Sequence, residues 1–247
     1  MIARTSAVIR ADGGLGAVRC EPPLTLRQVG TDDPATSALC LVGTAAGPLP
    51  GDDLALDLRL EPGAWVKLTA AGASIAQGRG GAAATLRWSA EVGAGARLHA
   101  DPGALVVCEG SRVDVAVQIA LARDAAVEWH ELVVLGRRGD ARAGAATLRW
   151  DVRRDGRPLL HQYVDLTDAS PWRGLTGGHR VMASVLISGP DVDARTVVAS
   201  PTAIGQRVDD HTMLLTVLGD SAAEVTRTQH ALWPNALSRP EVGLRGD

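Results

Sequence analysis

The pentapeptide ATLRW occurs twice in this chain, at residues 84–88 and again at residues 146–150. In an extended strand the Leu and Trp of each copy would share one face, while the Thr and Arg would point to the other face. The copies are too far apart in the sequence to be the two strands of one hairpin. A string that recurs at this distance suggests a repeated structural unit in which both copies hold the same place.

Turn-forming residues recur at half that spacing. From Gly63 they follow at Gly93, Asp124 and Asp155, with nearly constant steps between them. The turns separate runs with an apolar residue at every second position, such as LALDLRL before the first turn and VDVAVQIAL before the third. This alternation is typical of β-strands with one buried face. We therefore predict a mainly β fold, a β-helix-like stack of strand–turn–strand units of about 31 residues each.

The repeat is clearest over residues 51–167, and turn residues punctuate residues 1–50 in a way that favours short edge strands. We predict a β-helix-like domain over residues 1–167. A small C-terminal α+β portion over residues 168–247 would pack on it as part of one continuous fold.

The pattern changes at the loop 168–178, and the next segments predict both strands and helices. Residues 181–187 and 213–218 read as strands, and residues 191–198 as a short helix. Ser221 and Glu224 have the spacing of a capping box at the start of a longer helix, which would end before Pro234.

Composition excludes several classes of protein. The 247 residues carry a formal net charge of −3, and no segment combines basic and aromatic residues as a nucleic-acid groove does. No apolar run is long enough for a membrane span, and the N-terminus lacks the features of a secretory signal. The three cysteines, Cys20, Cys40 and Cys108, are too far apart for a zinc knuckle or disulfide framework. We expect a soluble cytoplasmic protein that binds neither nucleic acid nor membrane.

Three short segments combine residue types that ligate metals. They are His99 with Asp101, Glu128 with His130, and the cluster Asp209-Asp210-His211. Pairs of this kind are common by chance, so each is interpreted as an ordinary exposed polar group rather than a metal site. The sequence also lacks a nucleophile elbow, a phosphate-binding loop and an HExxH motif. Catalytic machinery is therefore not visible in the sequence.

Glu131 is the most informative single residue. In a strand over residues 127–135 the inward face would carry Glu131 among four apolar residues: Val127, Trp129, Val133 and Leu135. A buried carboxylate is costly unless it is paired or protonated. Either a β-bulge or a nearby arginine relieves this cost, or Glu131 lines an internal polar passage. The residues alone leave these alternatives open.

Four motifs in order give this chain a resemblance to the UreD/UreH urease accessory proteins. They are GDDLALDLRLEPGA (residues 51–64), LTAAGAS (68–74), ELVVLGR (131–137) and DGRPLL (155–160). The resemblance implies a β-helix-like fold and a non-enzymatic scaffold that binds UreF, recruits the GTPase UreG and docks on the urease apoprotein during nickel insertion. It implies no permanently bound cofactor, only nickel in transit through an internal water-filled tunnel, and such a tunnel would explain an inward Glu131.

The chain departs from the family pattern at Ile75, which replaces a lysine, and at Gly103 and Ala104, which replace an amide and an acid. The acidic residue expected a few places after Arg137 is displaced or absent, and Asp140 is a poor substitute. If the missing groups conduct nickel in the family, then His99, Asp101 and Glu109 are the nearby substitutes, beside Glu131.

Two other functions remain open. A β-helical enzyme acting on polysaccharide would share the coil period, but the scattered tryptophans do not form a sugar platform. A β-scaffold for an unrelated partner is the second.

Overall fold

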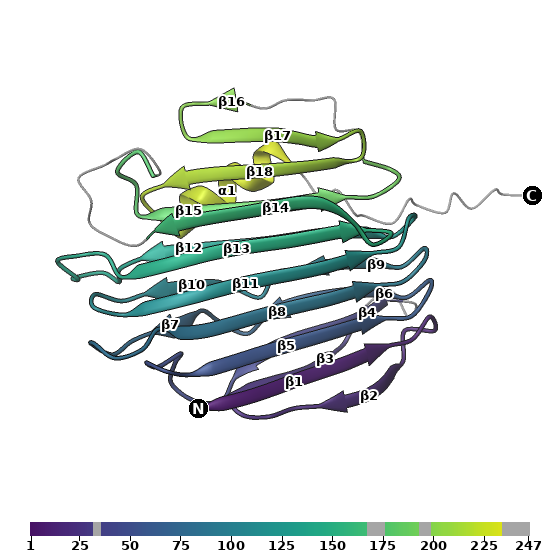
Figure 1. Ribbon diagram of the computed structural model, residues 1–247, viewed down its shortest axis with the longest axis horizontal. Helices are drawn as coiled ribbons and strands as arrows, with labels where there is room; N and C mark the ends of the chain where they lie inside the picture. Colours follow the sequence, from purple (N-terminus) through teal and green to yellow (C-terminus); the bar gives the residue numbers. More distant parts are fainter. Residues whose placement is uncertain (32–35, 167–175, 193–198, 234–247) are drawn as a thin grey trace, which may run out of the picture.

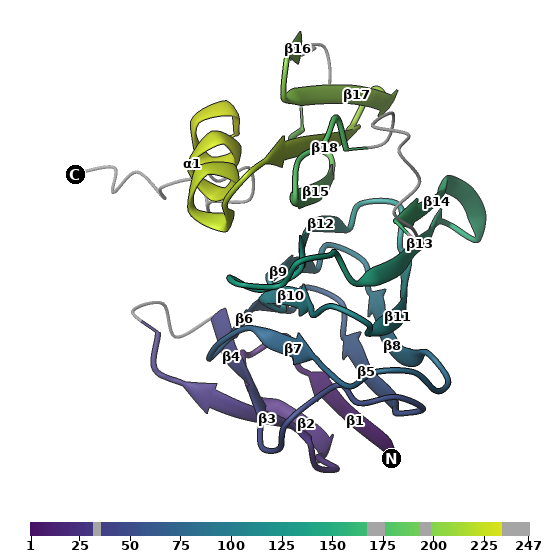
Figure 2. The ribbon, with the colours of Figure 1, turned by 90° about the vertical axis from the view of Figure 1, so that its left-hand side faces the viewer.

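The computed structural model describes residues 1–31, 36–166, 176–192 and 199–233. Its strands form two large sheets that face each other (Figures 1 and 2). The seven-stranded sheet contains, in spatial order, β14 (Arg157–Leu166), β13 (Ala145–Arg154), β11 (Arg112–Leu121), β8 (Ala84–Val92), β5 (Asp53–Leu60), β1 (Ile2–Ile9) and β2 (Leu15–Arg19).

The second sheet runs in the order β16 (Ala199–Ser200), β17 (Ala203–Asp209), β18 (Thr212–Gly219), β15 (Val181–Ser188), β12 (Ala126–Leu135), β9 (Arg97–Ala100), β6 (Trp65–Ala70), β4 (Thr36–Gly43) and β3 (Leu24–Val29). Two further strands, β7 (Ser74–Ala76) and β10 (Ala104–Val107), join it through β12. The chain alternates between the sheets as it winds, and so forms a β-solenoid of about four turns. The predicted β-helix-like fold is confirmed.

The recurring pentapeptides occupy matching places in this solenoid. Strands β5, β8, β11 and β13 pair in parallel, and one row across them contains Leu56, Trp88, Val117 and Trp150. The two tryptophans therefore stand two coils apart in the same row. All four side chains are buried in the core between the sheets, whereas Thr85 and Arg87 are only partly buried. The alternation in ATLRW thus places its Leu and Trp inside, as predicted.

The turns stack as regularly as the strands. Gly63 adopts a positive φ of 76° and its N–H donates to the carbonyl oxygen of Ala94, in the turn of the next coil, at 2.8 Å. At Gly93 a Cβ atom would lie 2.8 Å from the carbonyl oxygen of Leu60. A larger residue at this corner would push neighbouring coils apart, which explains why glycine stands there.

The solenoid begins earlier in the chain than the sequence pattern suggests. Strand β1 pairs in parallel with β5, and β4 pairs in parallel with β6, so both are rungs of the solenoid. The prediction of short edge strands over residues 1–50 is right for β2 and β3 but wrong for β1 and β4. Their turns are irregular in sequence, which hid the repeat.

The C-terminal portion extends the second sheet with antiparallel strands. Strand β15 pairs with β12, and β18 and β17 follow it. Helix α1 (Ala222–Leu232) packs on this extension (Figure 2). Its buried residues are Val225 and Gln229. Ser221 caps the helix by accepting from the N–H of Glu224, while Glu224 accepts from the N–H of Asp220. Most of the expected helix at 191–198 and most of the loop 168–178 lie outside the described residues.

Within the described part of the chain, no helix is long and apolar enough to cross a membrane.

Candidate functional site

Strand β12 separates two different environments. One face holds Val127, Trp129, Glu131, Val133 and Leu135, whose side chains lie in the solenoid core or are buried beside it. The opposite face carries Glu128 and His130, followed by Leu132 and Val134, which pack in the apolar cluster beneath α1. Because side chains alternate along a strand, one segment supplies polar groups to both faces.

The neighbours of β12 change at the centre of this strand. Residues 126–129 pair with β9, and residues 132–135 pair with β10. Between them the chain of the preceding coil turns a corner at residues 101–103, so His130 and Glu131 lie opposite this corner. His130 and Glu131 therefore project to opposite faces of the sheet at the point where β12 changes its parallel partner.

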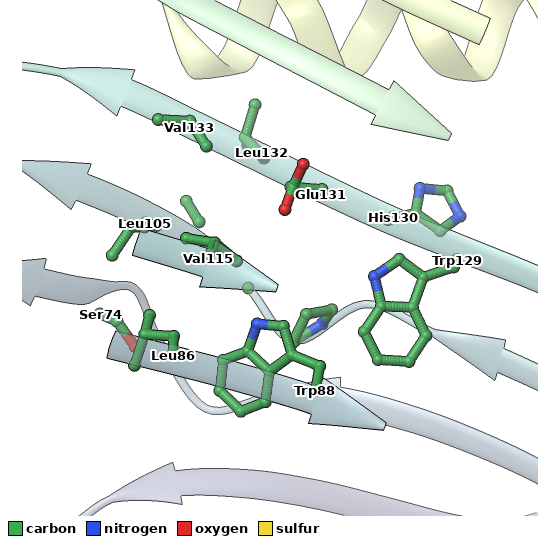
Figure 3. A pocket seen from close by; sticks show the side chains of 13 residues that line it. Ser74, Leu86, Trp88, Leu105, Val115, Trp129, His130, Glu131, Leu132 and Val133 are labelled. Atoms are coloured by element: carbon green, nitrogen blue, oxygen red, sulfur yellow. The ribbon is translucent and has the colours of Figure 1, made fainter. Parts of the chain in front are cut away.

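Glu131 points into the solenoid, as Figure 3 shows, and is 8% exposed. Its Oε2 accepts from the indole N–H of Trp150 at 2.9 Å, whereas Oε1 has no partner among the described residues. The surrounding pocket includes Trp88 and Trp129 and has a volume of about 20 Å³. That is room for a single water molecule.

Burial raises the pKa of the Glu131 carboxyl to about 7, although the hydrogen bond from Trp150 acts in the opposite direction. The carboxyl therefore exchanges its proton near neutral pH. The interpretation that a β-bulge turns Glu131 outward is wrong, because β12 keeps its register with β15 throughout. The interpretation that a nearby arginine satisfies Glu131 is also wrong, because its partner among the described residues is Trp150. An internal polar passage at Glu131 stays a prediction.

On the opposite face, two of the sequence segments meet. The register of β9 and β12 sets His99 beside Glu128, and His130 follows two residues later on the same face. His130 Nε2 lies 2.8 Å from Glu128 Oε1, and His99 Nδ1 lies 3.6 Å from the same oxygen. One ligand atom from each of the three residues lies within 4.8 Å of the others. This is the one such group of three or more metal-ligating side chains in the described part of the chain.

The interpretation of these residues as ordinary exposed pairs is wrong. The Glu128 side chain is 4% exposed, and those of His99 and His130 are 23% and 17% exposed. Burial raises the pKa of the Glu128 carboxyl, but the hydrogen bonds and charges of His130 and His99 outweigh this effect and lower the pKa to about 2. The sequence did contain a signal for this cluster. Residues 128 and 130 lie about one coil length after residue 99, so the repeat could have placed them side by side.

The cluster opens into a cleft of about 440 Å³ between the second sheet and α1. Lys67 lines this cleft from β6, Asp101 from the corner after β9, and His230 from the helix. Lys67 is the neighbour of His99 on β6. Metal-ligating and charged side chains therefore face the cleft from both of its walls.

The remaining candidates lie elsewhere. Glu109 is in the turn after β10, where its Oε2 accepts from the N–H of Ala141 at 3.2 Å. In the cluster Asp209-Asp210-His211, Asp209 accepts from Arg154, Asp210 pairs with Arg207, and His211 contacts the carbonyl oxygen of Val192. These residues do not converge on a common point.

Of the positions where this chain departs from the UreD/UreH sequence pattern, Gly103 and Ala104 line the Glu131 pocket, and Ile75 does not. Gly103 has a φ of 84°, and a Cβ atom there would lie 2.8 Å from Cβ of Ala70. The corner thus requires glycine in this chain. Ala104 also lines the pocket, whereas Ile75 is 45% exposed on β7.

Comparison with known proteins gives one consistent result. The family model of the UreD urease accessory protein matches residues 9–245. Urease accessory protein UreD 1 of Streptomyces griseus is 33% identical over 199 residues, which cover 78% of each chain. UreD of Parafrankia sp. is 33% identical over 229 residues, covering 80% of this chain and 75% of the relative. UreD of Streptomyces avermitilis is 31% identical over 250 residues, or 94% of each chain.

Proposed function

The chain belongs to the UreD family of urease accessory proteins, and on that premise we propose that it works with UreF and UreG to insert nickel into the urease apoprotein. Membership of this family gives it a role in urease maturation. The observation that carries the proposal is the match over residues 9–245, which spans the solenoid, β12 and the cleft beneath α1.

A scaffold role agrees better with the architecture than an enzyme acting on polysaccharide does. Sugar platforms need aromatic faces that a substrate reaches, whereas Trp88, Trp129 and Trp150 are at most 7% exposed in the core. The chain would act by holding partners and passing on nickel, without a permanently bound cofactor.

We propose Glu131 as a point on the nickel path inside the solenoid. Its Oε1 is not engaged by a described residue, and its pKa of about 7 leaves the carboxylate partly ionised at neutral pH. Carboxylate oxygens bind Ni²⁺ less tightly than imidazoles do, so they suit transit better than storage. The corner at residues 101–103 separates this pocket from the outer cleft, where Asp101 lies.

Helix α1 is our proposed contact for UreF. Its buried face, through Val225 and Gln229, is committed to the chain's own sheet. The opposite face, with Ala223 and Arg227, is exposed and available to a partner.

Coexpression tests this function. Urease subunits would be expressed with UreF, UreG and the other accessory genes, with and without this chain, in medium containing nickel. We expect urease activity to depend on the chain, and UreF and UreG to copurify with it. Full activity in its absence would contradict the proposal, provided that immunoblots show equal amounts of urease.

A further inference from the structure

We propose that His99, Glu128 and His130 bind one divalent transition-metal ion at the base of the cleft beneath α1. The proposed function supplies the identity of the physiological ion, Ni²⁺, and the inference rests on it in that respect alone. The site is distinct from Glu131, because its three side chains project from the opposite face of the second sheet.

The donor set selects the class of ion. Two imidazoles and one carboxylate suit nickel, copper and zinc, whereas magnesium and calcium prefer sites built from oxygen alone. The cluster therefore fits an ion of the borderline class, and Ni²⁺ belongs to it.

The spacing of the donors fits a shared ion. Bonds from a metal of this class to nitrogen or oxygen are about 2.0–2.2 Å, so adjacent ligand atoms lie roughly 3–4 Å apart. His130 Nε2 and His99 Nδ1 lie 2.8 and 3.6 Å from Glu128 Oε1, and all three ligand atoms are within 4.8 Å of one another. The two rings are tilted by 55°, with centroids 5.1 Å apart. Small side-chain rotations would bring all three donors to bonding distance.

An ion pair alone leaves this arrangement incompletely satisfied. Both histidines approach the same oxygen of Glu128, whereas Oε2 is buried and has no hydrogen-bond partner among the described residues. A buried carboxylate oxygen without a partner is costly. A metal ion at this place would engage the carboxylate and both imidazoles together, and it would relieve that cost.

The site is held in place yet reachable. The register of β9 and β12 fixes the three backbone positions, and Glu128 is buried, while both imidazoles keep part of their surface in the cleft. Three protein ligands leave further coordination positions open to water or to a donor from another molecule. Asp101, Lys67 and His230 also face the cleft. Such a site can take up and release an ion.

Nickel binding to the full chain, purified without a polyhistidine tag, tests the proposal. Isothermal titration with NiCl₂ in a non-chelating buffer at pH 7.5 would measure stoichiometry and Kd. Two complementary variants localise the site. The first is His99→Gln with His130→Gln, and the second changes the other four histidines (His161, His179, His211 and His230) to Gln.

We expect the second variant to keep a site for one ion, and the first to bind Ni²⁺ roughly 100-fold more weakly or worse. If the first variant binds as tightly as the wild type, or the second loses the ion while circular dichroism shows it folded, the proposal is overturned. If the first variant does not fold, Ni²⁺ binding by the second variant alone tests the proposal. A second variant that also fails to fold is replaced by its four single substitutions, of which none would abolish binding.

The titration contains no UreF, UreG or urease. A negative titration would therefore contradict the proposed metal site but not the proposed role in urease maturation, which the coexpression assay tests separately.

Discussion

The indole N–H of Trp150 on β13 reaches across the solenoid interior and donates to Glu131 on β12 at 2.9 Å. This bond joins the two sheets through Glu131, a buried carboxyl group on the face of β12 that points into the solenoid core. It also connects the repeated pentapeptide to the most unusual residue of the interior.

The first prediction concerns the pH dependence of stability. The Glu131 carboxyl has its ordinary pKa of 4.5 in the unfolded chain and about 7 in the folded chain. Between these values the folded chain binds the extra proton, so the free energy of unfolding falls as pH rises and the stabilisation is lost through pH 7. Urea unfolding at pH 5, 6, 7 and 8, in the presence of EDTA, measures this fall.

Glu131→Gln is the matched variant, because a neutral amide still accepts from Trp150. We expect it to be more stable than the wild type at pH 8 and to show a smaller fall between pH 5 and 8. Parallel profiles of the two proteins would mean that Glu131 does not titrate in this range.

The second prediction compares the two tryptophans of the repeat. Trp88→Ala and Trp150→Ala should each cost about 3–5 kcal/mol, because both side chains fill the core. Trp150→Phe should cost roughly 1–3 kcal/mol more than Trp88→Phe, since it alone leaves Glu131 Oε2 without its donor. Urea midpoints of the four variants decide. Equal costs for the two Phe variants would argue against an energetic role for the bond.

Sequence reasoning predicted the part of the fold that depends on local alternation. The Leu and Trp of ATLRW, the apolar run of β11 and the inward Glu131 all follow from the period of two and the coil length. The bond from Trp150 to Glu131 did not follow, because it depends on how far apart the two sheets lie. Strands β1 and β4 were missed as rungs, since their turns do not repeat those of later coils.

The cluster of His99, Glu128 and His130 could be predicted from the sequence only in part. His99 lies about one coil before Glu128 and His130, so the repeat contained the signal. It could not show that the strand register aligns them, because the coils are unequal in length. The step from Trp88 to Val117 along one row is shorter than the step from Val117 to Trp150. Nor could the repeat show that α1 would form the other wall of a cleft.

The third prediction concerns partner binding through α1. Ala223→Glu with Arg227→Glu reverses the charge of the exposed face and leaves Val225 and Gln229 packed. We expect copurification of UreF to fall at least about tenfold, because new charges without complementary partners weaken an interface. A control variant, Arg157→Glu on the exposed strand β14, should keep it. Undiminished UreF binding by a folded α1 variant would remove this helix from the interface.

The fourth prediction concerns Glu131 in nickel delivery. Glu131→Gln should fold and bind UreF, yet support less urease activation at limiting nickel, because an amide is a weaker ligand than a carboxylate. Excess nickel should restore part of the activity. Full activation at limiting nickel, with normal yield of the variant, would exclude Glu131 from the path.

The nickel content of urease itself is the most direct measurement of the proposed role. Urease would be purified from cells that express all accessory genes, with and without this chain, and its nickel per active site determined by mass spectrometry. We predict folded urease with little nickel when the chain is absent, and a normal content when it is restored. Equal nickel content in both preparations would contradict a role in nickel insertion.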